Sequence, residues 1–231
     1  KIRVHIHAND PSEVFRVAAR FGTVAGEKAD DMQRQQHSAH STDRRVAIVT
    51  DSAADIPEAE LDRLDIHMIP VRVHFGARSY LDKVGITSDE FYAEIERGTE
   101  PPKTSQPPPG DFRRQFEFLG SHHSAVISIN LTSRVSGTCA AAQTAAARTA
   151  THGKVSVIDT GNISAGQGLI AMYAAECAAA GYDADRIIAA TKAILPRTRS
   201  FGVAGSLEYA VRGGRLPRWV KRVADALRLM P

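Results

Sequence analysis

Several features that mark specialised protein classes are scarce in this sequence of 231 residues. It has two cysteines, Cys139 and Cys177, too few for a disulfide-stapled scaffold or a thiolate cluster, so we expect both to be buried as small apolar residues. The balance of 29 Lys and Arg against 26 Asp and Glu leaves a net charge of only +3, too small to indicate nucleic-acid binding. No basic segment followed by an apolar core marks a secretory signal. These absences favour a cytoplasmic protein.

Long apolar runs and the common catalytic signatures are also lacking. The most apolar stretch, 163–181, contains Gln167 and Glu176 and is dominated by alanine, which is typical of a packed helix and not of a membrane span. No Gly-x-Ser-x-Gly elbow, Walker loop or dinucleotide fingerprint occurs, which disfavours hydrolases, nucleotidases and dehydrogenases. The nine histidines show no zinc-ligand spacing, so we expect no metal and no cofactor.

Alternating strand and helix patterns dominate from residue 45 onward and predict an α/β fold with a mainly parallel sheet flanked by helices. We expect strands at 46–49, 66–73, 125–129 and 155–158. We expect helices at 58–64, 88–97, 110–119, 136–151, 164–180 and 184–195. A further strand at 201–204, a short helix through Tyr209 and a basic helix at 217–229 complete the pattern.

The chain before residue 45 has a different character. Residues 1–7 alternate like a strand, Asp10 and Pro11 begin a short helix that ends at Gly22, and 23–29 form a weaker strand, which together make a small βαβ fragment. A polar linker follows. We therefore expect a region at 1–36, a linker at 37–44, an α/β domain at 45–160 and the incomplete start of a second α/β domain at 161–231. The sequence begins directly in a strand pattern and stops before the last domain is complete, so we expect a fragment of a longer protein.

Two groups of hydroxyl residues are candidate anion-binding sites. The first contains Thr104 and Ser105, and the second contains Ser133, Ser136 and Thr138 around a glycine. The second group follows a predicted strand and precedes an alanine-rich helix, which is where parallel sheets bind ligands. Gly137 would let a ligand approach the backbone closely. Ordinary helix capping and turn formation explain both groups equally simply.

Asp51 and a basic C-terminal segment are the remaining candidates. Asp51 follows a strand, as in phosphotransferases with two spaced aspartates, but Ala53 stands where the second would be, which favours a loop-shaping role. The basic residues Arg215, Arg218 and Lys221 fit either a solvated helix face or a docking surface for an acidic partner protein.

Five ordered motifs between residues 45 and 229 resemble those of the DegV family. They are Val49-Thr50-Asp51-Ser52, Lys103-Thr104-Ser105-Gln106-Pro107, Ser133-x-x-Ser136-Gly137-Thr138, Val157-Ile158-Asp159 and Leu207 followed by Gly213-Gly214-Arg215. The resemblance implies a bacterial, non-enzymatic lipid-binding protein that holds one long-chain fatty acid in an apolar tunnel between two α/β domains. It also implies the carrier subunit of a fatty acid kinase, which serves phospholipid metabolism.

Carried over residue by residue, the family's carboxylate site falls on Thr104 and Ser136, with the N–H groups of Gly137 and Thr138 nearby. Ser105 and Ser133 are neighbours of lower rank. Pro108 and Cys139 depart from the family pattern and could alter the pocket. A serine-dependent acyl-transfer or hydrolytic enzyme using Ser136 is the alternative, and it lacks a motif that supplies a base.

The N-terminal residues resemble a different protein. Val4-His5-Ile6-His7, Asp10-Pro11, Phe21-Gly22 and Asp31-Met32-x-x-Gln35 look like the C-terminus of the dihydroxyacetone-kinase-like kinase subunit. The resemblance implies a natural fusion of kinase and carrier, so that the kinase partner acts in cis or in trans. A pure interaction module, with 1–36 and the basic segment as its docking surfaces, is a third hypothesis.

Overall fold

The computed structural model describes residues 2–24, 26–29, 45–98, 100–150, 153–203 and 206–226. The chain divides into two compact units, each built from separated stretches of sequence. We call the unit made of Lys1–Asp30, Arg72–Ser105 and Val203–Pro231 the first unit. The second unit comprises Asp31–Val71 and Gln106–Gly202.

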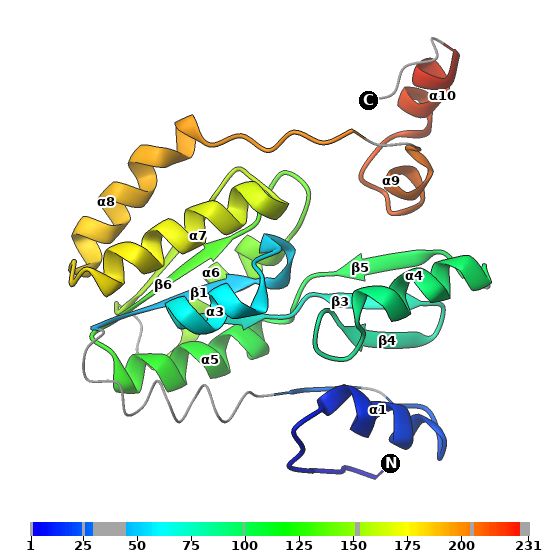
Figure 1. Cartoon of the computed structure of the whole chain (residues 1–231), viewed down its shortest axis with the longest axis horizontal. Helices are drawn as coiled ribbons and strands as arrows, with labels where there is room; N and C mark the ends of the chain where they lie inside the picture. The colour runs from blue at the N-terminus through cyan, green and yellow to red at the C-terminus, as the bar shows by residue number, and fades with distance from the viewer. Residues whose placement is uncertain are drawn as a thin grey trace. The chain divides into compact units, whose positions relative to one another are not determined.

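The second unit contains a four-stranded parallel sheet in the order β2-β1-β6-β7 (Figure 1). Its strands are β1 (Val46–Asp51), β2 (Ile66–Ile69), β6 (Ala125–Asn130) and β7 (Val155–Asp159). The pairing is parallel throughout, with Val46 opposite Ala125 and Val126 opposite Val155. The predicted α/β fold with a parallel sheet is therefore confirmed.

Helices cover both faces of this sheet because its central strands are apolar on both sides. Ile48 faces a core formed with α3 (Glu58–Leu64), α7 (Ser164–Ala179) and α8 (Ala184–Ile194). Val49, one residue on, faces a core formed with α5 (Pro109–His122) and α6 (Thr138–Arg148). This alternation follows from the two-residue period of a strand. Two short 3₁₀ turns, Ser52–Ala54 and Leu195–Arg197, complete the unit.

The first unit contains a three-stranded antiparallel sheet in the order β4-β3-β5, which we did not predict. Its strands are β3 (Arg72–Phe75), β4 (Arg78–Leu81) and β5 (Pro102–Ser105), and α4 (Ser88–Arg97) packs on it through Phe91 and Ile95. The strand predicted at 66–73 is wrong as a single element. Pro70, which has no backbone N–H to donate, separates its two halves, and they belong to different sheets.

Three short helices also belong to the first unit. They are α1 (Pro11–Ala19), α9 (Glu208–Arg212) and α10 (Arg218–Ala226). The strands expected at 1–7, 23–29 and 201–204 do not form in the described parts of those ranges, because their backbones pair with no neighbouring strand. The predicted linker, 37–44, lies outside the described residues. Within the described chain, no helix has the length and hydropathy needed to span a bilayer.

Candidate functional site

The second unit has one position in its sheet where the direction of chain progression reverses. The chain passes from β1 outward to β2 and from β6 outward to β7, so the reversal lies between β1 and β6. In open α/β sheets the loops that follow two such strands splay apart, and ligands bind outside the carboxyl ends of the strands. Thr50 and Asp51 end β1, and the hydroxyl-rich loop from Leu131 to Gly137 follows β6.

Asp51 joins the ends of these two strands. Its side chain is fully buried, and one carboxylate oxygen, Oδ2, accepts hydrogen bonds from the Leu131 N–H at 3.0 Å and from Asn130 Nδ2 at 3.3 Å. The other oxygen accepts from the Ala53 N–H at 3.2 Å. Burial raises the pKa of Asp51, and the hydrogen bonds from Leu131, Gln167 and Asn130 oppose that rise. Asp51 thus shapes its own loop, as predicted, and also fixes the start of the loop after β6.

A layer of buried polar side chains lies beside Asp51. The Thr50 hydroxyl donates to the Ile129 carbonyl oxygen at 2.7 Å and accepts from Gln167 Nε2 at 3.2 Å. Ser128 Oγ donates to Asn130 Oδ1 at 2.8 Å. Thr50, Ser128, Asn130 and Gln167 are all almost completely buried. These hydrogen bonds fix the side chains in one conformation, because leaving a buried polar group without a hydrogen bond lowers the stability by about 1–3 kcal/mol.

Asp159, at the end of β7, holds the middle of the same loop. Its carboxylate accepts from the Ser133 N–H at 3.2 Å and from the Gly161 N–H at 2.9 Å. Partial burial acts to raise the pKa of Asp159, but the hydrogen bonds from Ser133 and Gly161 outweigh it and the pKa is lowered. Thr132 is fixed as well, because its N–H donates to the Asn162 carbonyl oxygen at 2.9 Å.

The predicted Ser136-Gly137-Thr138 group forms the entry to α6. The two hydroxyl oxygens lie 2.9 Å apart, and Ser136 Oγ also accepts from the Thr138 N–H at 3.2 Å. Thr138 is fully buried, whereas Ser136 is half-buried. A side chain at position 137 would meet only the end of the exposed Gln106 side chain, which can move aside. Gly137 is the N-cap of α6, and Ser136 stands just before it.

Thr104 and Ser105 belong to the first unit, where they lie on the edge strand β5 and not at a helix start. Both side chains are exposed. The Thr104 hydroxyl accepts a hydrogen bond of 2.7 Å from Arg215 Nη2, and Ser105 Oγ lies 2.8 Å from His74 Nε2. Partial burial, together with the charge of Arg72, lowers the pKa of His74, which favours the neutral ring.

The basic segment has partners inside the first unit. Arg215 contacts Thr104 and its own turn at the Gly213 carbonyl oxygen. Lys221, on α10, lies 2.6 Å from Asp225 and 3.8 Å from Glu208, and its hydrogen bond to Asp225 is the largest cause of its raised pKa. Arg218 is exposed on the same helix.

A hollow of about 690 Å³ in the second unit lies beside this loop. It includes Ser133 and Asp159, and its cationic lining residues are Arg134, Lys192 and Arg199. Ser136 is not among the lining residues.

The structure thus separates the predicted residues into two groups. Ser133, Ser136, Gly137 and Thr138 share one loop in the second unit, while Thr104, Ser105 and the basic residues belong to the first. Sequence reasoning missed the buried set behind the loop: Thr50, Ser128, Asn130 and Gln167. The available signal was the clustering of polar residues at the ends of two apolar strands. Within the described residues, the hydrogen-bond partners of Ser136 Oγ are both in Thr138, which is no general base.

Comparison with known proteins shows to which family the chain belongs. The family model for uncharacterised proteins of the DegV family matches residues 45–231. The chain is a member of the DegV family. A model for the FakA-like middle domain of fatty acid kinases matches residues 1–39. The predicted family is confirmed, and so is the resemblance of the N-terminal segment to a fatty acid kinase subunit, although the match is to the middle domain of that subunit and not to its C-terminus.

Curated DegV relatives match the same part of the chain. A DegV domain-containing protein of Caldanaerobacter subterraneus subsp. tengcongensis is 35% identical over 187 residues, which cover 81% of this chain and 66% of the relative. Protein DegV of Bacillus subtilis is 34% identical over 187 residues, covering 80% and 66%. The chain therefore spans about two thirds of the length of these relatives.

Solved DegV structures share the fold. The Bacillus subtilis protein, described as a fatty acid binding protein, has a TM-score of 0.68 at 30% identity, over 81% of this chain and 65% of its own. A protein from Thermus thermophilus, described by its fatty acid binding, has a TM-score of 0.67 at 30% identity, over 74% and 60%. A stearic acid-binding protein from Eubacterium ventriosum has a TM-score of 0.69 at 27% identity, over 75% and 61%. Among the described residues, no group of His, Cys, Asp or Glu is placed to hold a metal ion.

Proposed function

We propose that this protein binds one long-chain fatty acid and presents its carboxylate to a kinase, without catalysing the reaction itself. The observation that carries the proposal is the pair of hydroxyls on Ser136 and Thr138, 2.9 Å apart at the entry to α6 and at the reversal point of the sheet. The solved relatives described as fatty acid binding proteins support it.

The chemistry of the loop suits a carboxylate. Ser136 supplies a neutral O–H donor that the buried Thr138 hydroxyl holds in place, and the first N–H groups of α6 have no partner within the helix. Neutral donors orient a carboxylate without neutralising its charge, so an oxygen keeps a lone pair for attack on phosphorus. In the proposed transfer this oxygen bonds to the γ-phosphorus of ATP, the bond to the bridging oxygen breaks, and ADP leaves. ATP and the transfer machinery belong to the kinase, in cis or in trans.

The acyl chain would supply most of the affinity from an apolar tunnel, since each buried methylene contributes about 0.8 kcal/mol. Thr104 is proposed as a second carboxylate ligand, with Ser105 and Ser133 as lower-ranked neighbours. Arg215, Arg218 and Lys221 are proposed to contact the kinase. The match of residues 1–39 to the middle domain of a fatty acid kinase subunit favours such a partner.

Release kinetics of bound lipid test the hydroxyl ligands. In Ser136→Ala, transfer of fatty acid from the full chain to acceptor vesicles should become about 10- to 100-fold faster, because a hydrogen bond to a charged group contributes about 1.5–3 kcal/mol. Thr104→Val, which keeps the branched shape, should act likewise. Ser121→Ala and Thr144→Val are matched controls, since those hydroxyls bond only to their own helices. Unchanged release in both site variants would refute the assignment.

A further inference from the structure

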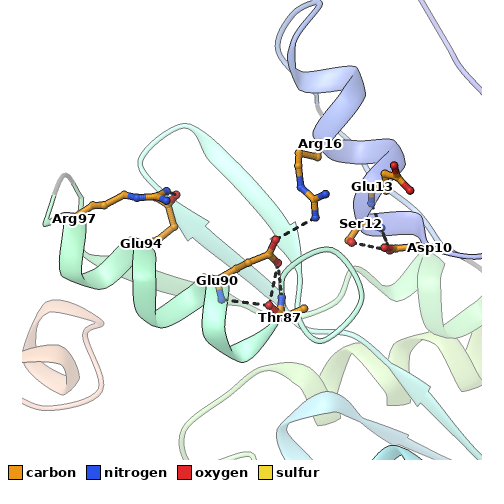
Figure 2. A network of polar contacts seen from close by, with 8 residues as sticks. All are labelled: Asp10, Ser12, Glu13, Arg16, Thr87, Glu90, Glu94 and Arg97. Atoms are coloured by element: carbon orange, nitrogen blue, oxygen red, sulfur yellow. Dashed lines mark hydrogen bonds and ion pairs between the residues drawn. The ribbon is translucent and has the colours of Figure 1, made fainter.

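The first unit brings together two segments that match different families. Residues 2–29 fall within the kinase-domain match, and residues 72–105 fall within the DegV match. Figure 2 shows α1, from the kinase-like segment, beside the beginning of α4. The contacts between them define a specific surface.

The α1 helix is well capped but too short to be stable alone. Asp10 accepts hydrogen bonds from the Ser12 N–H at 2.9 Å and the Glu13 N–H at 3.4 Å, and Pro11 occupies the first turn. Isolated helices of fewer than about 12 residues are marginal in water even with good caps. With nine residues, α1 therefore depends on packing for its stability.

The packing side of α1 is an apolar stripe. Its half-buried positions follow the spacing of one helix face: Pro11, Val14, Phe15 and Ala18. Phe15 Cδ2 lies 3.5 Å from the place that a side chain on Gly85 would occupy, so the ring lies against the turn after β4. Phe21, just beyond the helix, is 88% exposed.

A polar contact next to Phe15 sets the register of the helix. Arg16 Nη2 lies 3.2 Å from Glu90 Oε1. The other Glu90 oxygen is held by the Thr87 N–H at 3.0 Å and the Thr87 hydroxyl at 3.1 Å, which is the capping box of α4 (Figure 2). Both members of the ion pair are about half exposed, so it contributes orientation more than affinity.

A second contact lies at the other end of the segment. Both terminal nitrogens of Arg72 donate to the Glu27 carbonyl oxygen at 3.4 Å, and Glu27 is buried. Arg72 begins β3 and is paired across the sheet with Ser105 on β5, next to Thr104. The kinase-like segment thus rests on the strand adjacent to the one that carries a proposed carboxylate ligand.

We propose that the surface formed by Arg72, Gly85 and Glu90 is the docking site for the kinase-like segment, residues 2–24 and 26–29 of this chain. The segment contributes three groups to this contact: the Phe15 ring, the Arg16 guanidinium and the Glu27 backbone carbonyl. The docking fixes the kinase-like segment to the sheet that contains Thr104. It does not require that the protein binds lipid, because the two family matches and the contacts alone carry it.

Hydrogen–deuterium exchange of the full chain tests the docking. In the unaltered protein, the amides of residues 14–20 should be protected. Phe15→Ala should accelerate their exchange by on the order of tenfold and should also accelerate exchange in the 85–90 turn. Phe21→Ala, which removes an exposed ring of equal size near the same helix, should change neither. Arg16→Gln should loosen the helix, while Arg20→Gln, at the exposed C-cap position, should have a clearly smaller effect.

A second pair of variants separates docking from helix capping. Glu90→Gln keeps the capping box, because glutamine serves equally in it, but removes the charge that pairs with Arg16. It should accelerate exchange in residues 14–20 and leave α4 unchanged. An unprotected α1 in the unaltered chain, or equal effects of Phe15→Ala and Phe21→Ala, would overturn the proposal. Fatty acid content measured in the same samples reports separately on the proposed function, so the two can fail independently.

Discussion

The buried carboxylate of Asp51, at the end of β1, accepts a hydrogen bond of 3.0 Å from the N–H of Leu131, the first residue after β6. These residues lie far apart in the sequence and on the two strands that flank the reversal point of the sheet. The bond fixes where the loop with Ser133 and Ser136 leaves the sheet. Asp51 therefore acts as a positioning residue for the proposed lipid site.

Replacing Asp51 with asparagine should lower the free energy of unfolding by about 1–3 kcal/mol, because an amide N–H₂ would face backbone donors where a carboxylate oxygen now accepts. Chemical denaturation measures this. Asp185→Asn is a suitable control, since Asp185 is exposed in the first turn of α8. Equal stability of the Asp51 variant and the unaltered protein would show that the bond to Leu131 contributes nothing.

The same substitution should change the pH dependence of stability. Burial raises the pKa of Asp51 above its ordinary value near 4, so the folded state binds more protons at this group than the unfolded state does. Its contribution to stability is greatest at low pH and declines as the pH rises from about 4 through the raised pKa. The stability difference between the unaltered protein and Asp51→Asn should therefore shrink as the pH increases. A difference that grows with pH would contradict the raised pKa.

Two glycines in helices should respond oppositely to alanine. A side chain on Gly168 of α7 would collide with the Ala54 carbonyl oxygen in the loop after β1, so Gly168→Ala should cost about 1–3 kcal/mol. Gly110, in the first turn of α5, has nothing within 4 Å of that position, so Gly110→Ala should stabilise by about 0.4–1 kcal/mol. Urea unfolding distinguishes the two, and destabilisation by both would refute the packing argument.

The thiol of Cys139 should be unreactive in the folded protein. Burial raises its pKa to about 11, and the nearby carboxylates of Asp159 and Asp51 act in the same direction. At pH 8 only about one thiol in a thousand is then ionised, and the buried thiol is also inaccessible to the reagent. Iodoacetamide followed by peptide mass spectrometry should label Cys139 only after denaturation. Rapid labelling of the native protein would contradict its burial at the start of α6.

Charge reversal on α10 tests kinase contact. Arg218→Glu should weaken binding of a fatty acid kinase, with a smaller effect in high salt, and leave lipid content unchanged. At Lys221 the neutral substitution Lys221→Gln is preferable to charge reversal. Lys221 pairs with Asp225 and Glu208, and an acidic residue in its place would repel both carboxylates. Loss of lipid together with loss of the partner would show that α10 is structural.

Local signals in the sequence were sufficient for much of the fold. The helices at 58–64 and 88–97 were predicted with their observed bounds, and for the second of them Gly98 was a visible stop signal. The parallel sheet followed from four apolar runs. The antiparallel sheet did not, because β4 and β5 are short and largely polar. β4 follows β3 through a tight turn at Gly76 and Ala77, whereas β5 pairs with β3 from a distant part of the sequence.

The site shows the same division. Hydroxyl density identified the loop that carries Ser136. The role of Asp51 could not be read from its own motif, because its burial depends on Asn130 and Gln167, which lie 79 or more positions away. Likewise, the surroundings of Thr104 suggested a helix start, whereas the hydrogen bond from Arg215 comes from 111 residues further along the chain.

The most direct test of lipid binding is native mass spectrometry of the purified chain, combined with organic extraction and identification of the released lipid. We predict one long-chain fatty acid per chain, retained through purification and displaced by added fatty acid of similar length. A chain that remains empty after incubation with saturated and unsaturated fatty acids of 14 to 20 carbons, on the order of the lengths that such a tunnel would hold, would contradict the proposed function.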